Sequence, residues 1–139
     1  MSGIRRISKQ KIDSVLQKNE RQYLVGNLKT PQVLQHIHDE NVEVGLSYYK
    51  QFTADKPHIH REVTEYQMIL EGYSEILNLI TNKVTKLNAG DFYIVEKETP
   101  YAQKSAANTK ILFFKHPSVN DKKVIEASNE LKEWLKTKI

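Results

Sequence analysis

The pattern of apolar and polar positions divides the chain into a short helical segment, a long β-rich stretch and a second helical segment. From 8 to 19, Ile12 and Leu16 recur at helical spacing, and Ser8 suits the N-cap position. From 22 to 114, short runs rich in β-branched and aromatic residues alternate with turn residues, which predicts strands. Towards the end of the chain, helical spacing returns.

The predicted strands are short, and local turn chemistry separates them. Asn41, Asn82 and the segment 88–91 supply turns, and Gly72 separates two strands. The predicted strands are 23–25, 33–38, 42–52, 59–60, 66–71, 73–80, 83–87, 92–95, 101–104 and 110–114. Many short strands joined by hairpins favour an all-β fold with flanking helices, an antiparallel barrel or sandwich, over a parallel α/β sheet.

The end of the chain predicts an amphipathic helix. Ser118 or Asn120 can cap a segment that runs from about 121 to 138, in which Val124 and Leu131 share an apolar face. We expect this helix to pack outside the β-rich region, with a role in a dimer as the alternative. The predicted organisation is a single domain over 1–139, with an N-terminal helical segment at 1–21, a β-barrel at 22–117 and a C-terminal helix at 118–139.

Composition excludes several classes of function. The 139 residues contain no cysteine and carry a formal net charge of +4. Disulfides and thiolate ligands are therefore excluded, and any metal must be held by His, carboxylate, phenol or amide groups. No apolar run approaches the roughly 20 residues of a membrane span, and no DNA-reading motif is present. We expect a soluble, cytoplasmic protein with no nucleic-acid or membrane partner, whose charge mildly favours an anionic substrate.

The segment from His58 to Gly72 carries the candidate chemistry. It reads His-x-His, four residues, Glu65, six residues and then glycine. Side chains two positions apart on a strand face the same side, so His58 and His60 point together, and Glu65 can meet them from the next strand. Two imidazoles and one carboxylate bind one face of a metal ion and leave its other positions open for substrate.

This spacing matches the first motif of the cupin superfamily. The segment 87–95, Leu-Asn-Ala-Gly-Asp-Phe-Tyr-Ile-Val, resembles the opening of the second cupin motif, so the resemblance covers about 42–114. It implies a small single-domain cupin of the type-2 kind, an antiparallel double-stranded β-helix of jelly-roll type. The second motif departs from the family pattern, because counting from Gly90 places Tyr101 where the family has a histidine.

Three roles remain open for Tyr101. Its oxygen could bind the metal as a phenolate, or it could stay a phenol and hydrogen-bond a metal-bound water or a substrate oxygen. The third role is that of an aromatic side chain packed in a degenerate pocket. Strand parity places Gln67 on the face of Glu65 and Gln103 on the face of Tyr101, so both amides are candidate substrate-pocket residues.

Other polar residues are interpreted as structural. A second His-x-His pair, His36 and His38, lacks the following glutamate and glycine, and we interpret it as two polar residues on a half-exposed strand, with a secondary metal site or a substrate contact as the alternative. Glu62 is expected to be a solvated rim residue. Lys115 and His116 are also expected to be solvated, with contact to an anionic substrate as the alternative.

The resemblance implies a metal-dependent enzyme that acts on a small molecule. One divalent ion, Zn, Ni, Mn or Fe, would be bound by His58, His60 and Glu65, with Tyr101 as a further ligand or as a catalytic group beside Glu65. The alternative is that His58, His60 and Glu65 form a hydrogen-bonded polar cluster without a metal. We expect an isomerase, epimerase or lyase acting on a sugar-like or hydroxy-carbonyl substrate, with a dioxygenase as a further option. The alternative is a metal-containing cupin that binds or senses a small ligand without catalysis. We also expect a homodimer, in which the strand 42–52 adds an edge to a neighbour's sheet.

Overall fold

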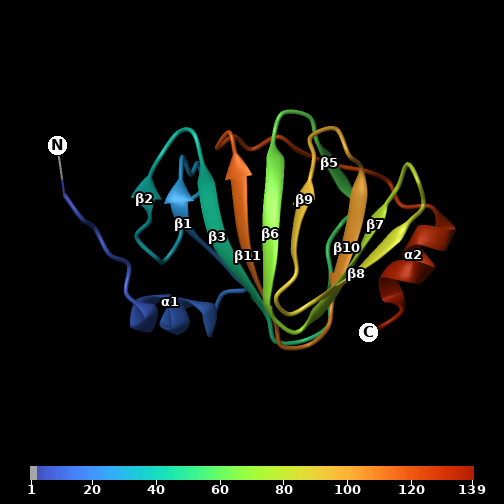
Figure 1. Cartoon of the computed structure of the whole chain (residues 1–139), viewed down its shortest axis with the longest axis horizontal. Coiled ribbons are helices and arrows are strands. Elements are labelled where there is room, and N and C mark those ends of the chain that lie inside the picture. The colour runs from blue at the N-terminus through green and yellow to red at the C-terminus, as the bar shows by residue number, and fades with distance from the viewer. Residues whose placement is uncertain (1–2) are drawn as a thin grey trace.

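Two six-stranded sheets face each other, and a short helix lies near each end of the chain (Figure 1). The computed structural model describes residues 3–139. The first sheet has the order β2 (Ile37–His38), β1 (Arg21–Gly26), β3 (Glu43–Tyr49), β11 (Thr109–His116), β6 (Thr64–Glu71) and β9 (Phe92–Val95). The second sheet has the order β12 (Lys122–Val124), β5 (His58–His60), β10 (Tyr101–Ser105), β7 (Tyr73–Asn78) and β8 (Val84–Asn88), with β4 (Thr53–Ala54) also paired to β10.

The inward-facing positions of β6 and β11 change from polar to apolar along the strands. Glu65, Gln67 and Ile69 alternate as the buried residues of β6, as strand parity predicts. Their partners across the antiparallel pair are Lys115, Phe113 and Ile111, in that order. One end of the space between the sheets is therefore polar, and the other end holds an apolar core. The main buried members of that core are Tyr49, Ile69, Leu87 and Ile111.

Gly72 occupies the tight turn between β6 and β7 because no other residue fits there. Its φ of +89° lies in the region that side chains with a Cβ avoid. A Cβ atom at this position would also lie 2.7 Å from the Cα atom of Thr109. The glycine that ends the first motif thus lets the chain pass from β6 in the first sheet to β7 in the second, close against the start of β11.

The N-terminal helix agrees with the prediction, and the C-terminal helix is shorter than expected. Helix α1 (Lys9–Leu16) begins after Ser8, whose Oγ accepts a hydrogen bond from the Lys11 amide. Helix α2 (Asn129–Lys136) begins after Ser128, so the expected helix from 121 and the caps Ser118 and Asn120 were wrong.

The reason for the late start of α2 is the strand β12, which pairs with β5. Residues 122–124 satisfy the backbone groups along the outer side of this short strand. Ser118 is buried instead, where its Oγ accepts a hydrogen bond from the Asn27 amide. Helix α2 packs outside the second sheet as expected, with Leu131 against Leu77 and Ala102.

Two further expectations need correction. The predicted strand 33–38 forms only the two-residue β2, which pairs with β1 in parallel. The strand β3 lies between β1 and β11, so the segment 42–52 cannot offer an edge to a second chain.

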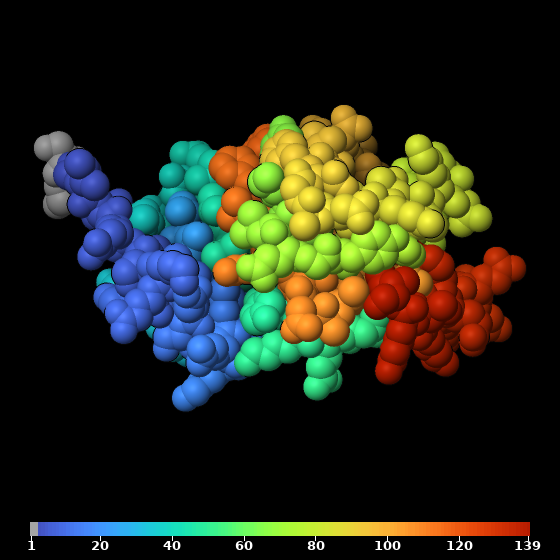
Figure 2. Space-filling view, turned by 60° about the horizontal axis from the view of Figure 1, so that its bottom comes forward, coloured from blue at the N-terminus to red at the C-terminus, as the bar shows by residue number. Residues whose placement is uncertain are grey.

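The two helices lie at opposite ends of the molecule's long dimension (Figure 2). Each described helix has eight residues, and neither is long and apolar enough to cross a membrane.

Candidate metal centre

All six predicted site residues line one small polar cavity between the two sheets. Its volume is about 40 Å³, which is room for an ion and a water molecule rather than for a whole substrate. The six are His58, His60, Glu65, Gln67, Tyr101 and Gln103. Eight further residues complete the lining: Arg21, Ser47, Tyr49, Asp55, Ile111, Phe113, Lys115 and Lys122.

Both histidines come from β5, and hydrogen bonds fix their tautomers. The His58 Nδ1 lies 2.7 Å from the carbonyl oxygen of Lys56, and the His60 Nδ1 lies 2.7 Å from Asp121 Oδ1. These oxygens accept hydrogen bonds, so both Nδ1 atoms carry a proton, and Nε2 is the nitrogen through which each ring could bind a metal. Metal-binding histidines in proteins have this arrangement.

Asp121 is a functional candidate that the sequence reading missed. Besides bonding His60, its Oδ2 accepts hydrogen bonds from the backbone amides of Glu62 and Val63. Partial burial opposes ionisation of this carboxyl, but the hydrogen bonds from His60 and the two amides lower its pKa. Asp121 belongs to neither motif, so no spacing in the sequence could have indicated its role.

Tyr101 is hydrogen-bonded directly to His58. Its hydroxyl lies 2.9 Å from the His58 Nε2, and because that nitrogen is unprotonated the phenol is the donor. Burial, reinforced by the nearby Glu65 charge, raises the pKa of Tyr101 well above its ordinary value. Burial also lowers the pKa of His58 to about 4. At neutral pH this pair is a protonated phenol and a neutral imidazole.

Glu65 is held by an amide on one side and by an ammonium group on the other. The Gln67 side-chain NH₂ donates to Glu65 Oε2, and Lys115 Nζ lies 3.7 Å from Oε1. Behind this pair, the Tyr93 hydroxyl donates to Gln67, and Gln103 Nε2 donates to the Tyr93 oxygen at 2.8 Å. The two predicted amides therefore orient Glu65 through a continuous hydrogen-bond network.

The donor set fits a divalent ion, although the ligands are not yet gathered around one point. Within residues 3–139, no group of three or more His, Cys, Asp or Glu side chains lies close enough to hold a metal. The fit rests on the chemistry of the donors: two imidazoles, each hydrogen-bonded through Nδ1, and one buried carboxylate line the same cavity. To bind a metal, the His58 Nε2 would have to give up its hydrogen bond from the Tyr101 hydroxyl.

Three cations line the cavity, and sequence reasoning identified none of them as inward-facing. Arg21 donates to Ser47 Oγ and to the Tyr49 hydroxyl, each at 2.9 Å. Lys115 was expected to be solvated, but its side chain is only 15 % exposed and lies between Glu65 and Glu43. Parity with Ile111 and Phe113 on β11 could have indicated the inward direction of Lys115.

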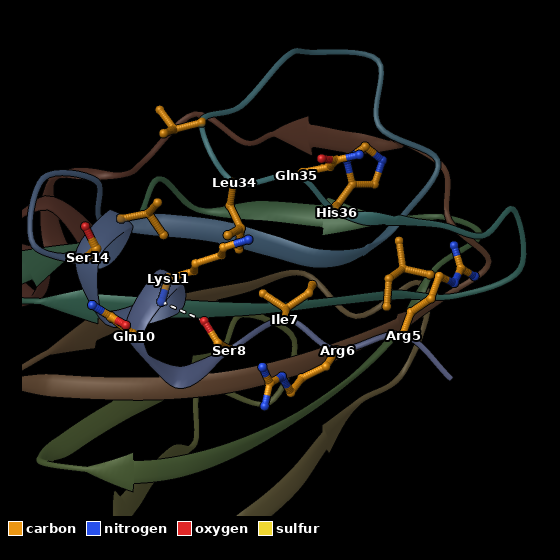
Figure 3. A pocket seen from close by; sticks show the side chains of 13 residues that line it. Arg5, Arg6, Ile7, Ser8, Gln10, Lys11, Ser14, Leu34, Gln35 and His36 are labelled. Atoms are coloured by element: carbon orange, nitrogen blue, oxygen red, sulfur yellow. Dashed lines mark hydrogen bonds between the residues drawn. The ribbon is translucent and has the colours of Figure 1, made fainter. Parts of the chain in front are cut away.

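A wider hollow lies away from the histidine cavity. Its volume is about 890 Å³, and it lies between the chain around α1 and the segment 33–37 (Figure 3). Arg5, Arg6 and His36 line it, and no carboxylate does. The two histidines of the second His-x-His pair do not face the same hollow. His36 lines this one, whereas His38 is exposed and lies 4.0 Å from Glu40. Glu62 is exposed, as expected.

Comparison with known proteins identifies the fold. No protein-family profile and no curated protein sequence matches the chain. Among solved structures, KdgF from a Halomonas species matches with a TM-score of 0.55 and 14 % identity, over 62 % of this chain and 77 % of that one. An RmlC-like cupin protein from Desulfovibrio desulfuricans matches with a TM-score of 0.51 and 18 % identity, over 67 % of this chain and all of the other.

A third similar structure is the DMSP lyase DddQ from Ruegeria pomeroyi, with a TM-score of 0.55 and 18 % identity. The match covers 70 % of this chain and 45 % of the lyase. These similarities confirm the predicted all-β, double-stranded β-helix fold of jelly-roll type.

Proposed function

From the premise that this chain is a small cupin domain, we propose that it is a metal-dependent enzyme that isomerises, epimerises or cleaves a small sugar-like or hydroxy-carbonyl molecule. The observation that carries the proposal is the pair His58 and His60, whose Nδ1 protons are both engaged while both residues line one cavity. The DMSP lyase among the similar structures supports lyase chemistry on this fold.

His58, His60 and Glu65 would hold one divalent ion, either Zn, Ni, Mn or Fe. When bound, such an ion polarises a carbonyl or hydroxyl oxygen of the substrate. His and carboxylate ligands serve all four metals, so availability would decide which one is bound. Iron would favour the dioxygenase option.

Tyr101 would hold the proton that the reaction moves. Its raised pKa keeps the phenol protonated at neutral pH, which suits donation to a substrate oxygen on which negative charge develops. The O–H becomes available to a substrate once His58 Nε2 has another partner. Gln67 and Gln103 keep Glu65 oriented, so the carboxylate remains at the cavity wall.

The test is elemental analysis of the protein purified without added metal. Wild-type protein should retain about one divalent ion per chain, and His58→Ala/His60→Ala should retain less than about a tenth of it. The matched control is His36→Ala/His38→Ala, which removes the other His-x-His pair and should leave the metal content unchanged. Wild-type protein that is metal-free and gains no thermal stability from any of the four ions would refute the proposal.

A second candidate function is a metal-containing cupin that binds or senses a small ligand without turnover. It is favoured by the pairing of polar groups inside the cavity, where Tyr101 already bonds His58 and Gln67 already bonds Glu65. The two functions differ in one measurement. A ligand that stabilises the protein and is recovered chemically unchanged after prolonged incubation would favour binding over catalysis.

A further inference from the structure

A second hollow shares a wall with the histidine cavity. This vestibule has a volume of about 450 Å³ and lies between the segment 27–33 and the segment 119–122. Arg21, His60 and Lys122 line both the vestibule and the histidine cavity, as does Lys115. A molecule seated in the vestibule would therefore reach the imidazole of His60 from the outside.

The vestibule is strongly positive. Its lining includes four cationic side chains, those of Arg21, Lys29, Lys115 and Lys122, and one carboxylate, Glu43. Two further carboxylates, Asp55 and Glu65, line the histidine cavity but not the vestibule, and Asp121, which bonds His60, lines neither. The vestibule, with four cations and one carboxylate, therefore attracts an anion more strongly than the histidine cavity, where three cations face two carboxylates.

Three of these cations, Arg21, Lys29 and Lys122, form no ion pair within residues 3–139. The Asp55 carboxylate in the histidine cavity is nevertheless close enough for its charge to act on Arg21 and Lys122. Lys115 is shared between Glu43 at 3.8 Å and Glu65 at 3.7 Å, so its charge is compensated.

Arg21 is also fixed in position, because the hydroxyls of Ser47 and Tyr49 hold its Nε and one terminal nitrogen. These bonds leave the other terminal nitrogen for a ligand. A planar guanidinium that is already oriented is well suited to bind a carboxylate.

We infer that Arg21 and Lys122 bind the carboxylate of a small hydroxy acid where the vestibule meets the histidine cavity. This inference deepens the proposed function by naming the substrate class: the carboxylate lies between the two cations, and the hydroxylated carbons extend towards His60 and Tyr101. The vestibule is large enough for a six-carbon sugar acid, whereas the histidine cavity alone is not.

The experiment measures binding of matched pairs of probes by calorimetry. Glycolate, tartrate and gluconate are each compared with the neutral polyol of the same length, ethylene glycol, threitol and sorbitol. At least one acid should bind, its neutral partner should bind at least tenfold more weakly, and added salt should weaken the binding of the acid.

Variants locate the site of binding. Lys122→Gln should weaken binding of the acid about tenfold, and so should Arg21→Lys, which keeps the charge but loses the planar fork. Lys123→Gln is the matched control, because Lys123 is the next residue on β12 and lines neither hollow. An equal loss of affinity in Lys122→Gln and Lys123→Gln would overturn the inference. Affinity that neither Lys122→Gln nor Arg21→Lys changes would also overturn it.

Metal content is measured on the same samples, so that each of the two proposals can be refuted independently of the other. Protein that retains a metal but binds none of the three acids refutes the inference and leaves the proposed function standing. Protein that binds an acid at Arg21 and Lys122 but takes up no divalent ion refutes the metal-dependent function and leaves the inference standing.

Discussion

At the scale of single residues, the site depends on how each polar side chain is partnered. His58 is neutral because burial lowers its pKa, and Tyr101 is protonated because burial raises its pKa. The tyrosine stands where the resemblance places a histidine, and it directly contacts the first histidine of the motif. This contact argues against the reading of Tyr101 as a packed aromatic without a polar role.

The depressed pKa of His58 predicts a loss of stability on acidification of the metal-free protein. Between pH 6.5 and about 4, the unfolded chain binds a proton at His58 that the folded chain does not bind, so the free energy of unfolding falls as the pH falls. The effect of this one group is at most about 3 kcal/mol across that interval. Denaturant unfolding with a chelator present measures it.

His58→Gln provides the comparison, because glutamine does not titrate. Its unfolding free energy should fall less between pH 6.5 and 4 than that of the wild type. Parallel pH dependences for the two proteins would show that His58 titrates normally in the folded state.

The hydrogen bond from His60 to Asp121 predicts that this carboxylate positions the imidazole. Asp121→Asn should weaken divalent metal binding about 10- to 100-fold, measured by competition with a chromophoric chelator. Asp39→Asn is the matched control, since Asp39 also accepts from backbone amides, those of Asn41 and Val42, but lies in a turn that does not line the cavity. Equal metal affinity in both variants would contradict the role of Asp121.

At the scale of elements, a buried lysine attaches helix α2 to the second sheet. Lys104 is 2 % exposed, and its Nζ donates to the carbonyl oxygens of Trp134 and Thr137, each at 2.8 Å. The same Nζ lies 4.3 Å from the centre of the Trp134 ring and 3.9 Å from Glu75. A cation at this end of a helix satisfies carbonyl groups that the helix itself cannot satisfy.

Lys104→Met should therefore release the C-terminal helix. The two carbonyl groups lose their donor, and we expect a loss of about 3 kcal/mol in unfolding free energy. Amide hydrogen exchange should accelerate most over residues 129–136. Lys86→Met, at an exposed position of the edge strand β8 in the same sheet, should change neither quantity by much. Similar effects of both substitutions would contradict this role for Lys104.

At the scale of the whole molecule, the outer face of the first sheet has an apolar surface. Tyr66 pairs with Ile94 and Phe114, and Met68 pairs with Phe92 and Leu112, so two apolar rows cross β9, β6 and β11. Phe92 is 67 % exposed and Ile94 is 47 % exposed. Between Cα positions the rows span roughly 10 by 7 Å, which suits the apolar centre of an interface that buries about 800 Å² per partner.

We propose this face, in place of the segment 42–52, as the contact surface of the expected homodimer. Sedimentation velocity should show a dimer for the wild type and a monomer for Phe92→Glu/Ile94→Glu, because two buried carboxylates would destabilise the interface. Ile80→Glu is the control, since Ile80 is 72 % exposed outside these rows and its substitution should leave the dimer intact. Wild-type protein that is monomeric at all concentrations would end the expectation of a dimer.

The sequence by itself determined the fold class and the first motif of the site. Strand parity is a local property with a period of two residues, so it placed His58 beside His60 and Gln67 beside Glu65 without knowledge of the rest of the chain. The spacing to Gly72 was equally informative, because the turn at that point accepts only a glycine.

Only the tertiary structure decided which distant residues complete the site. Asp121 follows His60 by 61 positions, and Arg21 approaches the cavity from a strand at the other end of the chain. Whether these residues lie at the site depends on which strands pair, and strand pairing is a non-local property that no short sequence pattern encodes. The same reason explains β12: residues 122–124 fit a helical pattern, but the free edge of β5 offered hydrogen bonds that only the folded sheet could supply.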